Sequence, residues 1–488
     1  MMYGELPVAL GPSLEDNRVA LQQILRIPHS GDAKCRDFYV GGIDACLFFI
    51  DGMAGQMQID SLILQPCRLF MGQIDCAPTE RADFCLRRIL DGNDVILSDA
   101  IQEIAKQVLE GKTAVLVEGC AQAMIVETRN YEKRPVGKTI MESVVMGPQQ
   151  GFVEHLRTNL TLIRRIIKSA QLTSEFHSIG SGLPTNLALV YLDGVCNPVV
   201  LDELRRRILS IDASHVPDVG HLQQLIEGGP FAMIPQTLLT ERPDRACHLL
   251  ADGHIAVMMD NSPYALMAPV SLFEFMFTAD DNFMRWQYST FNRLVRFFGL
   301  FISLLLPGLY VALTLFHTQM IPIELLTSIA ESRAKVPFPI IAELLIMEIS
   351  FYLINEAGTR MPSQIGSALG IVGALILGQA AVSANIISPL LIIIAALTGL
   401  GNYAIPDYGL GIAVQITRLL FLLAGAVLGL YGIALTMFAC LSILSSMNSF
   451  GQPYLAPQTP WRPNAEGGIV RFPHAKYFIT FAPEFVII

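Results

Sequence analysis

The stretch of residues 337–360 most constrains what this chain can fold into, because it places acidic side chains inside one of several long apolar runs. Glu343, Glu348 and Glu356 all lie in it. An ionised carboxylate in hydrocarbon costs at least about 2.5 kcal/mol, so such residues usually face a protein interior, a water-filled path or a partner charge. We therefore expect this stretch to carry the function.

Composition divides the chain into two parts. Hydrophobic residues make up 52% and charged residues 16% of the 488 residues, which is more apolar than an ordinary soluble protein. Nearly all long uncharged runs lie after about residue 296, whereas the first half has a soluble charge density. We predict an α/β cytosolic N-terminal half followed by an all-α polytopic membrane domain of four to five helices.

Charge, cysteines and motifs exclude several function classes. The formal net charge of −10 argues against a nucleic-acid partner, which normally needs a basic surface. The nine cysteines contain no C-x-x-C pair, so we expect reduced thiols and no metal site. The sequence does not match the P-loop or nucleophile-elbow motifs and suggests no catalytic His/Asp set. We therefore expect neither an enzyme nor a cofactor.

Strands alternate with helices in the first half and predict two small α/β subdomains. Two strand-like runs joined by Gly41 and Gly42 fit a hairpin. Residues 94–109 have helical periodicity. A basic amphipathic helix is expected over residues 152–169, with Arg164 on a solvated polar face; contact with anionic lipid is the alternative.

Domain borders are placed where the composition changes. The predicted parts are a first cytosolic α/β subdomain (1–135), a second with its linker (136–290), a transmembrane helical domain (291–450) and a C-terminal cytoplasmic tail (451–488). Residues 297–316 form an uncharged run of about twenty residues, long enough to cross a roughly 30 Å hydrocarbon core. Arg285, Arg293 and Arg296 precede this run, so the positive-inside rule places the N-terminal half in the cytoplasm.

Polar side chains at membrane depth are candidates for an ion path or a polar seam between helices. The predicted set is Glu343, Glu348, Asn355, Glu356, Arg360, Gln379 and Asn385. For Glu356 and Arg360 the alternative is an ion pair, one helical turn apart, that caps the helix at the membrane surface. For Gln379 and Asn385 the alternative is ordinary contact between helices.

Small residues recur in the run 365–384 and let helices approach closely. The expected helix-packing positions are Gly366, Gly370, Gly373 and Gly378. Asn385, Ser388 and Pro389 then interrupt the apolar run and predict a broken helix or a tight re-entry. We also predict a loop over residues 321–336 and a last membrane span over residues 419–444. Two topologies are then possible: four spans plus a non-crossing segment, or five spans with the C-terminal tail outside.

Several motifs, in order, resemble the GerA family of spore germination proteins, A-subunit type. Two of them read Gly147-Pro148-Gln149-Gln150-Gly151 and Glu356-Ala357-Gly358-Thr359-Arg360-Met361-Pro362. Residues 235–244 and 262–270 also resemble the family, and residues 370–382 look most similar to its SpoVAF branch. The likeness covers about residues 130 to 455. Tyr352 and Asn355 depart from the family, which usually has an acid and an arginine there.

This resemblance implies a multi-pass protein of the spore inner membrane, surrounded by membrane lipid, that acts in germination. It further implies a homo-oligomer, in the family a pentameric ion channel, with B-type transporter-like and C-type lipoprotein subunits as partners. The SpoVAF branch is associated with amplified ion release.

The preferred hypothesis is therefore an A-type subunit of an oligomeric germinant receptor and ion channel that releases cations. A secondary transporter of a small solute is the second hypothesis, suggested by the break near Asn385. A non-conducting scaffold for receptor clusters is the third.

Overall fold

The computed structural model describes residues 8–74, 76–90, 92, 94–129, 139, 142–144, 146–228, 233–360, 378–459 and 470–471. The chain divides into two compact units, which are described separately. Unit 1 comprises Met1–Pro230, Thr237–Val270 and Ser449–Gln452, and unit 2 comprises Phe231–Gln236, Ser271–Asn448 and Pro453–Ile488. The domain borders predicted after residues 135, 290 and 450 divide the chain into smaller parts than these two units, and they stay predictions.

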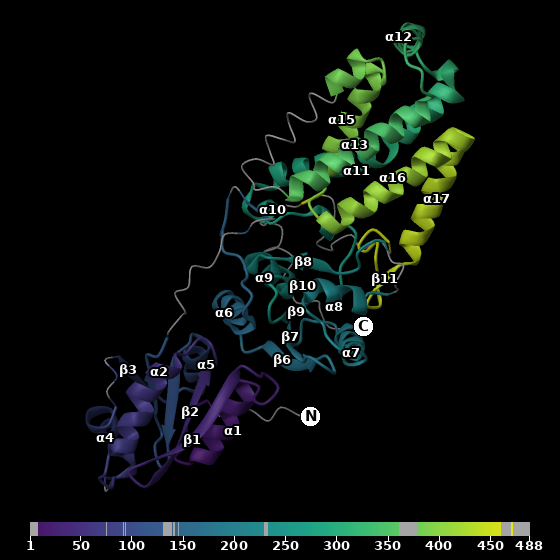
Figure 1. The fold of residues 1–488 in the computed structure, drawn as a ribbon. Coiled ribbons are helices and arrows are strands. Elements are labelled where there is room, and N and C mark those ends of the chain that lie inside the picture. The colour runs from purple at the N-terminus through teal and green to yellow at the C-terminus, as the bar shows by residue number, and fades with distance from the viewer. Residues whose placement is uncertain are drawn as a thin grey trace. The chain divides into compact units, whose positions relative to one another are not determined.

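The first part of unit 1, in which Figure 1 labels β1, β2 and β3, is a five-stranded antiparallel sheet with the order β1-β2-β4-β5-β3. Its strands are β1 (Ala33–Val40), β2 (Ile43–Ile50), β3 (Val95–Ser98), β4 (Thr113–Val117) and β5 (Ala123–Val126). Its main helices are α1 (Leu14–Ile24), α2 (Gln56–Ile59), α3 (Gln65–Leu69), α4 (Arg81–Arg88) and α5 (Ile101–Leu109). Gly41 and Gly42 have φ of 56° and 80° and form the two-residue turn between β1 and β2, so the predicted hairpin is confirmed.

The alternation of side chains along β2 gives this sheet two apolar faces. Cys46, Phe48 and Ile50 pack with α1 and α5, whereas Ala45 and Leu47 pack on the opposite side with α2, α3 and α4. The helix predicted over residues 94–109 is wrong in its first part, because β3 pairs with β5 and α5 begins only at Ile101. Strand pairing outweighs the local helical periodicity there.

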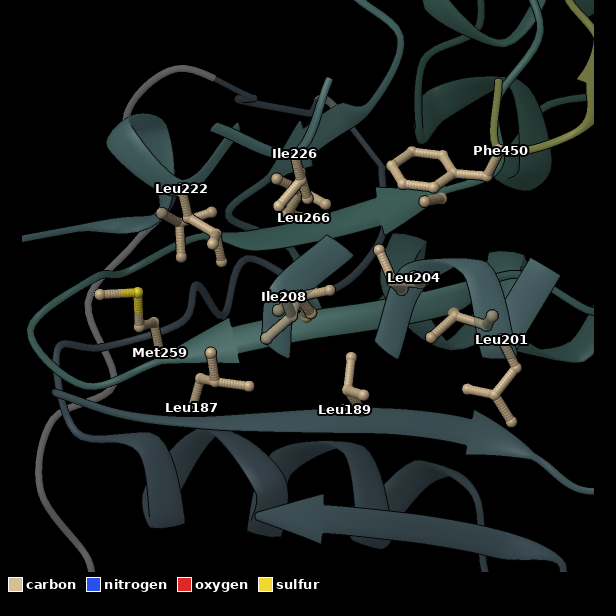
Figure 2. Close-up of a cluster of buried hydrophobic side chains, with 14 of the residues drawn as sticks. Leu187, Leu189, Leu201, Leu204, Ile208, Leu222, Ile226, Met259, Leu266 and Phe450 are labelled. Atoms are coloured by element: carbon tan, nitrogen blue, oxygen red, sulfur yellow. The ribbon is translucent and has the colours of Figure 1, made fainter. Parts of the chain in front are cut away.

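The second part of unit 1 is another antiparallel sheet, with the order β6-β7-β9-β10-β8. Its strands are β6 (Leu172–Ile179), β7 (Thr185–Leu192), β8 (Leu238–Thr240), β9 (Ile255–Met259) and β10 (Ala265–Ala268). Its helices are α6 (Leu156–Ile166), α7 (Pro198–Leu209), α8 (Val219–Ile226) and α9 (Pro243–Ala251). Figure 2 shows Leu204 and Ile208 of α7 and Leu222 of α8 packed over Leu187 and Leu189 of β7. The predicted α/β character of this half is confirmed.

A buried ion pair joins the two sheets of unit 1. Asp32 lies just before β1, and Arg164 lies on α6. The Arg164 side chain donates to both carboxylate oxygens of Asp32, from Nε at 2.7 Å and from Nη2 at 2.9 Å. Ser30 and Ser174 each donate a hydroxyl to Oδ1 at 2.7 Å. Arg164 is only 3% exposed, so the solvated face predicted for this helix is wrong at Arg164.

Arg164 also controls the ionisation of Asp32. Burial by itself opposes the charged form, but the charge and hydrogen bonds of Arg164, together with the hydrogen bonds of Ser30 and Ser174, outweigh it. The pKa of the Asp32 carboxyl is therefore held below its ordinary value of 3.8. A carboxyl whose pKa is lowered by folding stabilises the fold above its unfolded pKa, and this contribution is lost as the pH falls through the folded pKa.

Unit 2 is helical. Its helices include α10 (Asp280–Phe283), α11 (Trp286–Leu315), α12 (Ile323–Arg333), α13 (Ile340–Arg360), α15 (Pro389–Tyr403), α16 (Tyr408–Leu428) and α17 (Leu430–Ser446). In the part of the chain that the structure describes, α11 and α16 are long and apolar enough to cross a membrane, with mean hydropathies of 2.1 and 2.0. α15 and α17 are shorter apolar helices. The predicted helical C-terminal region is confirmed.

Local backbone signals decide where these helices begin and end. The single span predicted over residues 419–444 is wrong, because Gly429, with φ of 62°, separates α16 from α17. The loop predicted over residues 321–336 is also wrong, since it contains α12. The predicted break is confirmed: a helical stretch ends at residue 383, Asn385 has φ of 53°, and α15 begins at Pro389.

Glycines let α11 approach α15 and α16 at backbone contact. A Cβ added to Gly401 of α15 would lie 2.5 Å from the carbonyl oxygen of Gly299 on α11. A Cβ added to Gly425 of α16 would lie 2.7 Å from the carbonyl oxygen of Gly308, farther along α11. Close approach at small residues is the usual packing mode of apolar helices in lipid.

The Arg164–Asp32 pair predicts a pH-dependent loss of stability. Arg164→Met leaves the Asp32 carboxylate buried without its cation, so we expect the free energy of unfolding to fall by about 3–5 kcal/mol at pH 7. Without Arg164, burial favours the neutral carboxyl and raises the pKa of Asp32 in the variant, so the deficit should shrink as the pH falls from that raised pKa toward the lowered pKa of the parent chain. Urea unfolding of the full chain, followed by circular dichroism, measures both effects. Arg165→Met on the same helix is the control, and an equal loss in both variants would contradict the prediction.

The glycine contacts predict that space at Gly401 is limiting. Gly401→Leu should force α15 away from α11 and lower stability by about 1–3 kcal/mol or more. Gly399→Leu on the same helix is the matched control, because a Cβ there meets nothing within 4 Å. Thermal unfolding of the purified full chain compares the two variants. Equal midpoints for both would show that the Gly299–Gly401 contact does not limit the packing.

Candidate functional site

The polar site of unit 2 is built around Arg418 on α16 and Glu348 on α13. The Arg418 Nη2 lies 2.6 Å from the Glu348 Oε2, and both residues are 4% exposed. A charge-assisted hydrogen bond of this length is among the stronger polar contacts in proteins. The pair therefore joins two apolar helices through buried opposite charges.

Two further side chains complete this cluster. Tyr352 lies one turn after Glu348 on α13, and its hydroxyl accepts from Arg418 Nη2 at 3.2 Å and donates to the Gln415 carbonyl oxygen at 3.3 Å. Arg418 Nη1 donates to the Ser303 hydroxyl of α11 at 3.4 Å. One guanidinium thus contacts polar groups from α11 and α13 while it is itself carried by α16.

Glu343 forms a second cluster nearer the start of α13. Its side chain is fully buried, and Oε2 accepts the Ser388 backbone N–H at 3.0 Å. Ser388 caps α15, so the carboxylate lies at the positive end of that helix, where negative charge is favoured. Arg333 of α12 approaches the other oxygen at 3.7 Å. Glu343 therefore connects α12, α13 and α15.

The Glu343 cluster is less completely hydrogen-bonded than the Glu348 cluster. Among the described residues, two of its buried atoms, Glu343 Oε1 and Arg333 Nε, find no hydrogen-bond partner, whereas the Glu348 cluster leaves only Arg418 Nε without one. Buried polar atoms normally have partners, and leaving one unmet costs about 1–3 kcal/mol. Polar contacts therefore stabilise the helical unit less around Glu343 than around Arg418.

The other predicted site residues lie apart from these clusters. Glu356, Gln379 and Asn385 are exposed. Asn355 and Arg360 lie on α13, but their side chains are outside the described residues. Of the predicted packing positions, Gly366, Gly370 and Gly373 lie outside the described residues, and Gly378 is buried with Ile392 of α15 at 3.9 Å from an added Cβ. The structure thus buries Glu343 and Glu348 in two separate clusters.

The cations that pair with these acids, Arg418 and Arg333, are not among the residues predicted from the sequence. Arg418 had a visible signal, because it is the single charged residue between Asp407 and Arg462. An isolated charge in an apolar run usually marks a buried partner. Arg333 had no such signal, since it lies in a segment that contains several charges.

The geometry of the two clusters suits the positioning of helices. The described residues contain no group of three or more His, Cys, Asp or Glu side chains that could hold a metal ion. Paired opposite charges fix the relative register of helices and keep polar groups inside an apolar unit. The site can therefore organise a polar route or hold helices in place.

Comparisons with known proteins give consistent matches over most of the chain. Residues 20–478 match the profile of a family described as Bacillus/Clostridium GerA spore germination protein. Spore germination protein KA of Bacillus subtilis (strain 168) is 35% identical over 94% of this chain and 84% of its own length. Spore germination protein GerQA of Bacillus cereus is 38% identical over 78% of this chain and 77% of its own.

A solved structure is also similar to part of the chain. The N-terminal domain of the A subunit of the Bacillus megaterium spore germinant receptor GerK3 is 26% identical, with a TM-score of 0.42. The match covers 54% of this chain and 96% of that domain.

The Arg418–Glu348 pair predicts strong coupling between the two positions. Arg418→Met leaves a buried carboxylate without its cation and should cost about 3–5 kcal/mol, whereas Arg418→Met combined with Glu348→Gln should recover much of this loss. Thermal unfolding of the purified full chain in detergent measures the cycle. If the two single losses simply add in the double variant, the two side chains do not stabilise each other and the prediction is wrong.

Proposed function

This chain belongs to the GerA family of spore germination proteins, and we propose that it is an A-type subunit of an oligomeric germinant receptor that releases cations through the spore inner membrane. The observation that carries the proposal is the burial of charged side chains, Arg418 with Glu348, inside an apolar helical unit. Intramembrane charges of this kind usually mark ion or substrate pathways.

The proposed membrane orientation places unit 1 in the cytoplasm. The apolar lengths of α11 and α16 support a multi-pass arrangement. Arg285, Arg293 and Arg296 lie at the start of α11 or just before it. Arg293 and Arg296 both pair with Asp281, but acids contribute little to the positive-inside rule, so these arginines still favour the cytoplasmic side.

Within this proposal the three glutamates have different roles. Glu348 is paired with Arg418, and Glu343 is held at the start of α15, so both position the helices that carry the path. Glu356 is exposed on α13 and is the carboxylate that we assign to the path itself. Exposed Gln379 and Asn385 are the further candidates for its lining.

The path is proposed to form between copies of the chain. Family resemblance supports a homo-oligomer with the stoichiometry of a pentamer. The same resemblance supports B-type transporter-like and C-type lipoprotein subunits as partners. A SpoVAF-type amplifier of ion release is the finer form of the proposal. No catalytic step is part of it.

One alternative loses support from the geometry around α15. Secondary transporters with broken helices commonly direct a half-helix N-terminus at an anionic substrate. Here the N-terminus of α15 already binds the chain's own Glu343 carboxylate. A non-conducting scaffold is the other alternative, and electrical recording separates it from a channel.

Planar-bilayer recording of the purified full chain, with and without B- and C-type subunits, tests the proposal. We expect cation currents, and we expect Glu356→Lys to reduce them by about threefold or more, since a ring of opposite charge repels the permeant ion. Glu331→Lys is the matched control, because Glu331 is an exposed glutamate of α12.

The outcomes separate the hypotheses. A silent oligomer under every condition would favour the scaffold and overturn the channel. Currents that Glu356→Lys and Glu331→Lys leave equally unchanged would remove Glu356 from the path. Solute uptake by vesicles that contain only this chain would support the transporter instead.

A further inference from the structure

The chain makes a short hairpin directly after its last apolar helix. α17 ends at Ser446, and strands β11 (Asn448–Ser449) and β12 (Gln452–Pro453) follow. Phe450 and Gly451 form the two-residue tip, with φ of 48° and 90°. Asn or Gly usually occupies such left-handed positions, because a bulky side chain raises the conformational energy there. A phenylalanine at this tip therefore indicates that its side chain makes contacts that offset the strain.

The tip belongs to the core of unit 1. Residues Ser449–Gln452 are part of that unit, and Phe450 is only 1% exposed. Figure 2 shows its ring among Leu204 of α7, Ile226 of α8 and Leu266 of β10. Burial of a whole phenylalanine ring is a contribution of the size needed to offset one strained backbone position.

Polar contacts hold the hairpin tip in unit 1. The Arg207 guanidinium of α7 lies over the Phe450 ring, 4.5 Å from its centroid. The same guanidinium is fixed by Glu203 at 2.7 Å and by the Ile226 carbonyl oxygen at 2.7 Å. The Val270 backbone N–H donates to the Ser449 hydroxyl at 3.1 Å. Unit 1 therefore holds this segment by packing around the Phe450 ring, by the Arg207 cation over that ring and by the hydrogen bond from the Val270 backbone.

We propose that the hairpin tip, residues 449–452, is a permanent docking element that couples unit 1 to the last membrane helix. Ser449 follows Ser446 of α17 by three residues, so a shift of α7 or α8 moves the attachment point of that helix. The coupling rests on the proposed function, because it assumes that the helical unit lies in a membrane. The docking itself does not.

The same docking restricts the membrane topology. Val270 precedes α11 by a segment that contains only short helices, and Ser449 follows α17 almost directly. The hydrogen bond between these two residues places the start of α11 and the end of α17 on one side of the membrane. The number of crossings between Trp286 and Ser446 is then even. Of the two predicted arrangements, five spans with an outside tail does not meet this condition.

Hydrogen exchange of the purified full chain, read by mass spectrometry, tests the docking. Phe450→Ala should speed exchange in peptides that cover α7 and α8 by about tenfold or more, because these helices lose their buried partner. Phe450→Leu retains most of the apolar volume and should stay close to the parent chain. Phe438→Ala is the matched control, since Phe438 of α17 is 70% exposed. Unchanged exchange in Phe450→Ala would overturn the docking.

Cation release from spores that carry each variant as the sole copy tests the coupling. We expect Phe450→Ala to slow release about tenfold or more at an unchanged protein level, with Phe450→Leu and Phe438→Ala near normal. Faster exchange in Phe450→Ala combined with normal release would overturn the coupling and leave the docking intact. If the parent chain itself releases no cations, the proposed function fails, whereas the exchange result still decides the docking.

A reporter fused to the C-terminus tests the topology. An even number of crossings predicts that the reporter and a tag on unit 1 lie on the same side of the membrane, both protected from protease added outside intact cells. Cleavage of the C-terminal reporter alone would overturn the inference.

Discussion

A charge that leaves water needs an opposite charge nearby, and the helical unit depends on this requirement at Arg418. The guanidinium contacts Glu348, Tyr352 and Ser303, which lie on α13 and α11. Such a pair adds little net stability compared with a well-packed apolar pair, but its separation is costly because each charge would stay buried. It therefore fixes which turns of α11, α13 and α16 face one another, and the glycine contacts of α11 can then bring the backbones together.

In unit 1, the buried charge of Asp32 is compensated more completely than the charges of the helical unit. Asp32 accepts four hydrogen bonds, and the three from Arg164 and Ser174 link the first sheet to the second. This full set of donors explains why the pKa of Asp32 falls even though the carboxyl is buried. The two sheets are therefore held together by a contact that neither sheet contains alone, which agrees with their assignment to one compact unit.

Local patterns predicted what depends on local chemistry. Gly41 and Gly42 specified a hairpin, and Asn385 with Pro389 marked a helix break, because positive φ and proline act on the backbone wherever they occur. Gly429 carried the same kind of signal but was read as part of one span. The pairing of Arg418 with Glu348 could not be predicted, since it joins residues 70 positions apart and depends on how the helices pack. Burial of Arg164 was missed for the same reason, because its partner lies on a different sheet.

The two acidic clusters differ in how much a rearrangement would cost. Around Arg418, separation of the charges opposes any change of register, and α11 is in backbone contact with α15 and α16. Around Glu343, the Arg333 guanidinium lies 3.7 Å away and its side chain is 29% exposed, and neither Glu343 Oε1 nor Arg333 Nε has a hydrogen-bond partner among the described residues. Separating the groups around Glu343 therefore costs less free energy than separating Arg418 from Glu348. We expect a conformational change of the helical unit to move α12 and the start of α13 against α15, while α11 and α16 stay packed together.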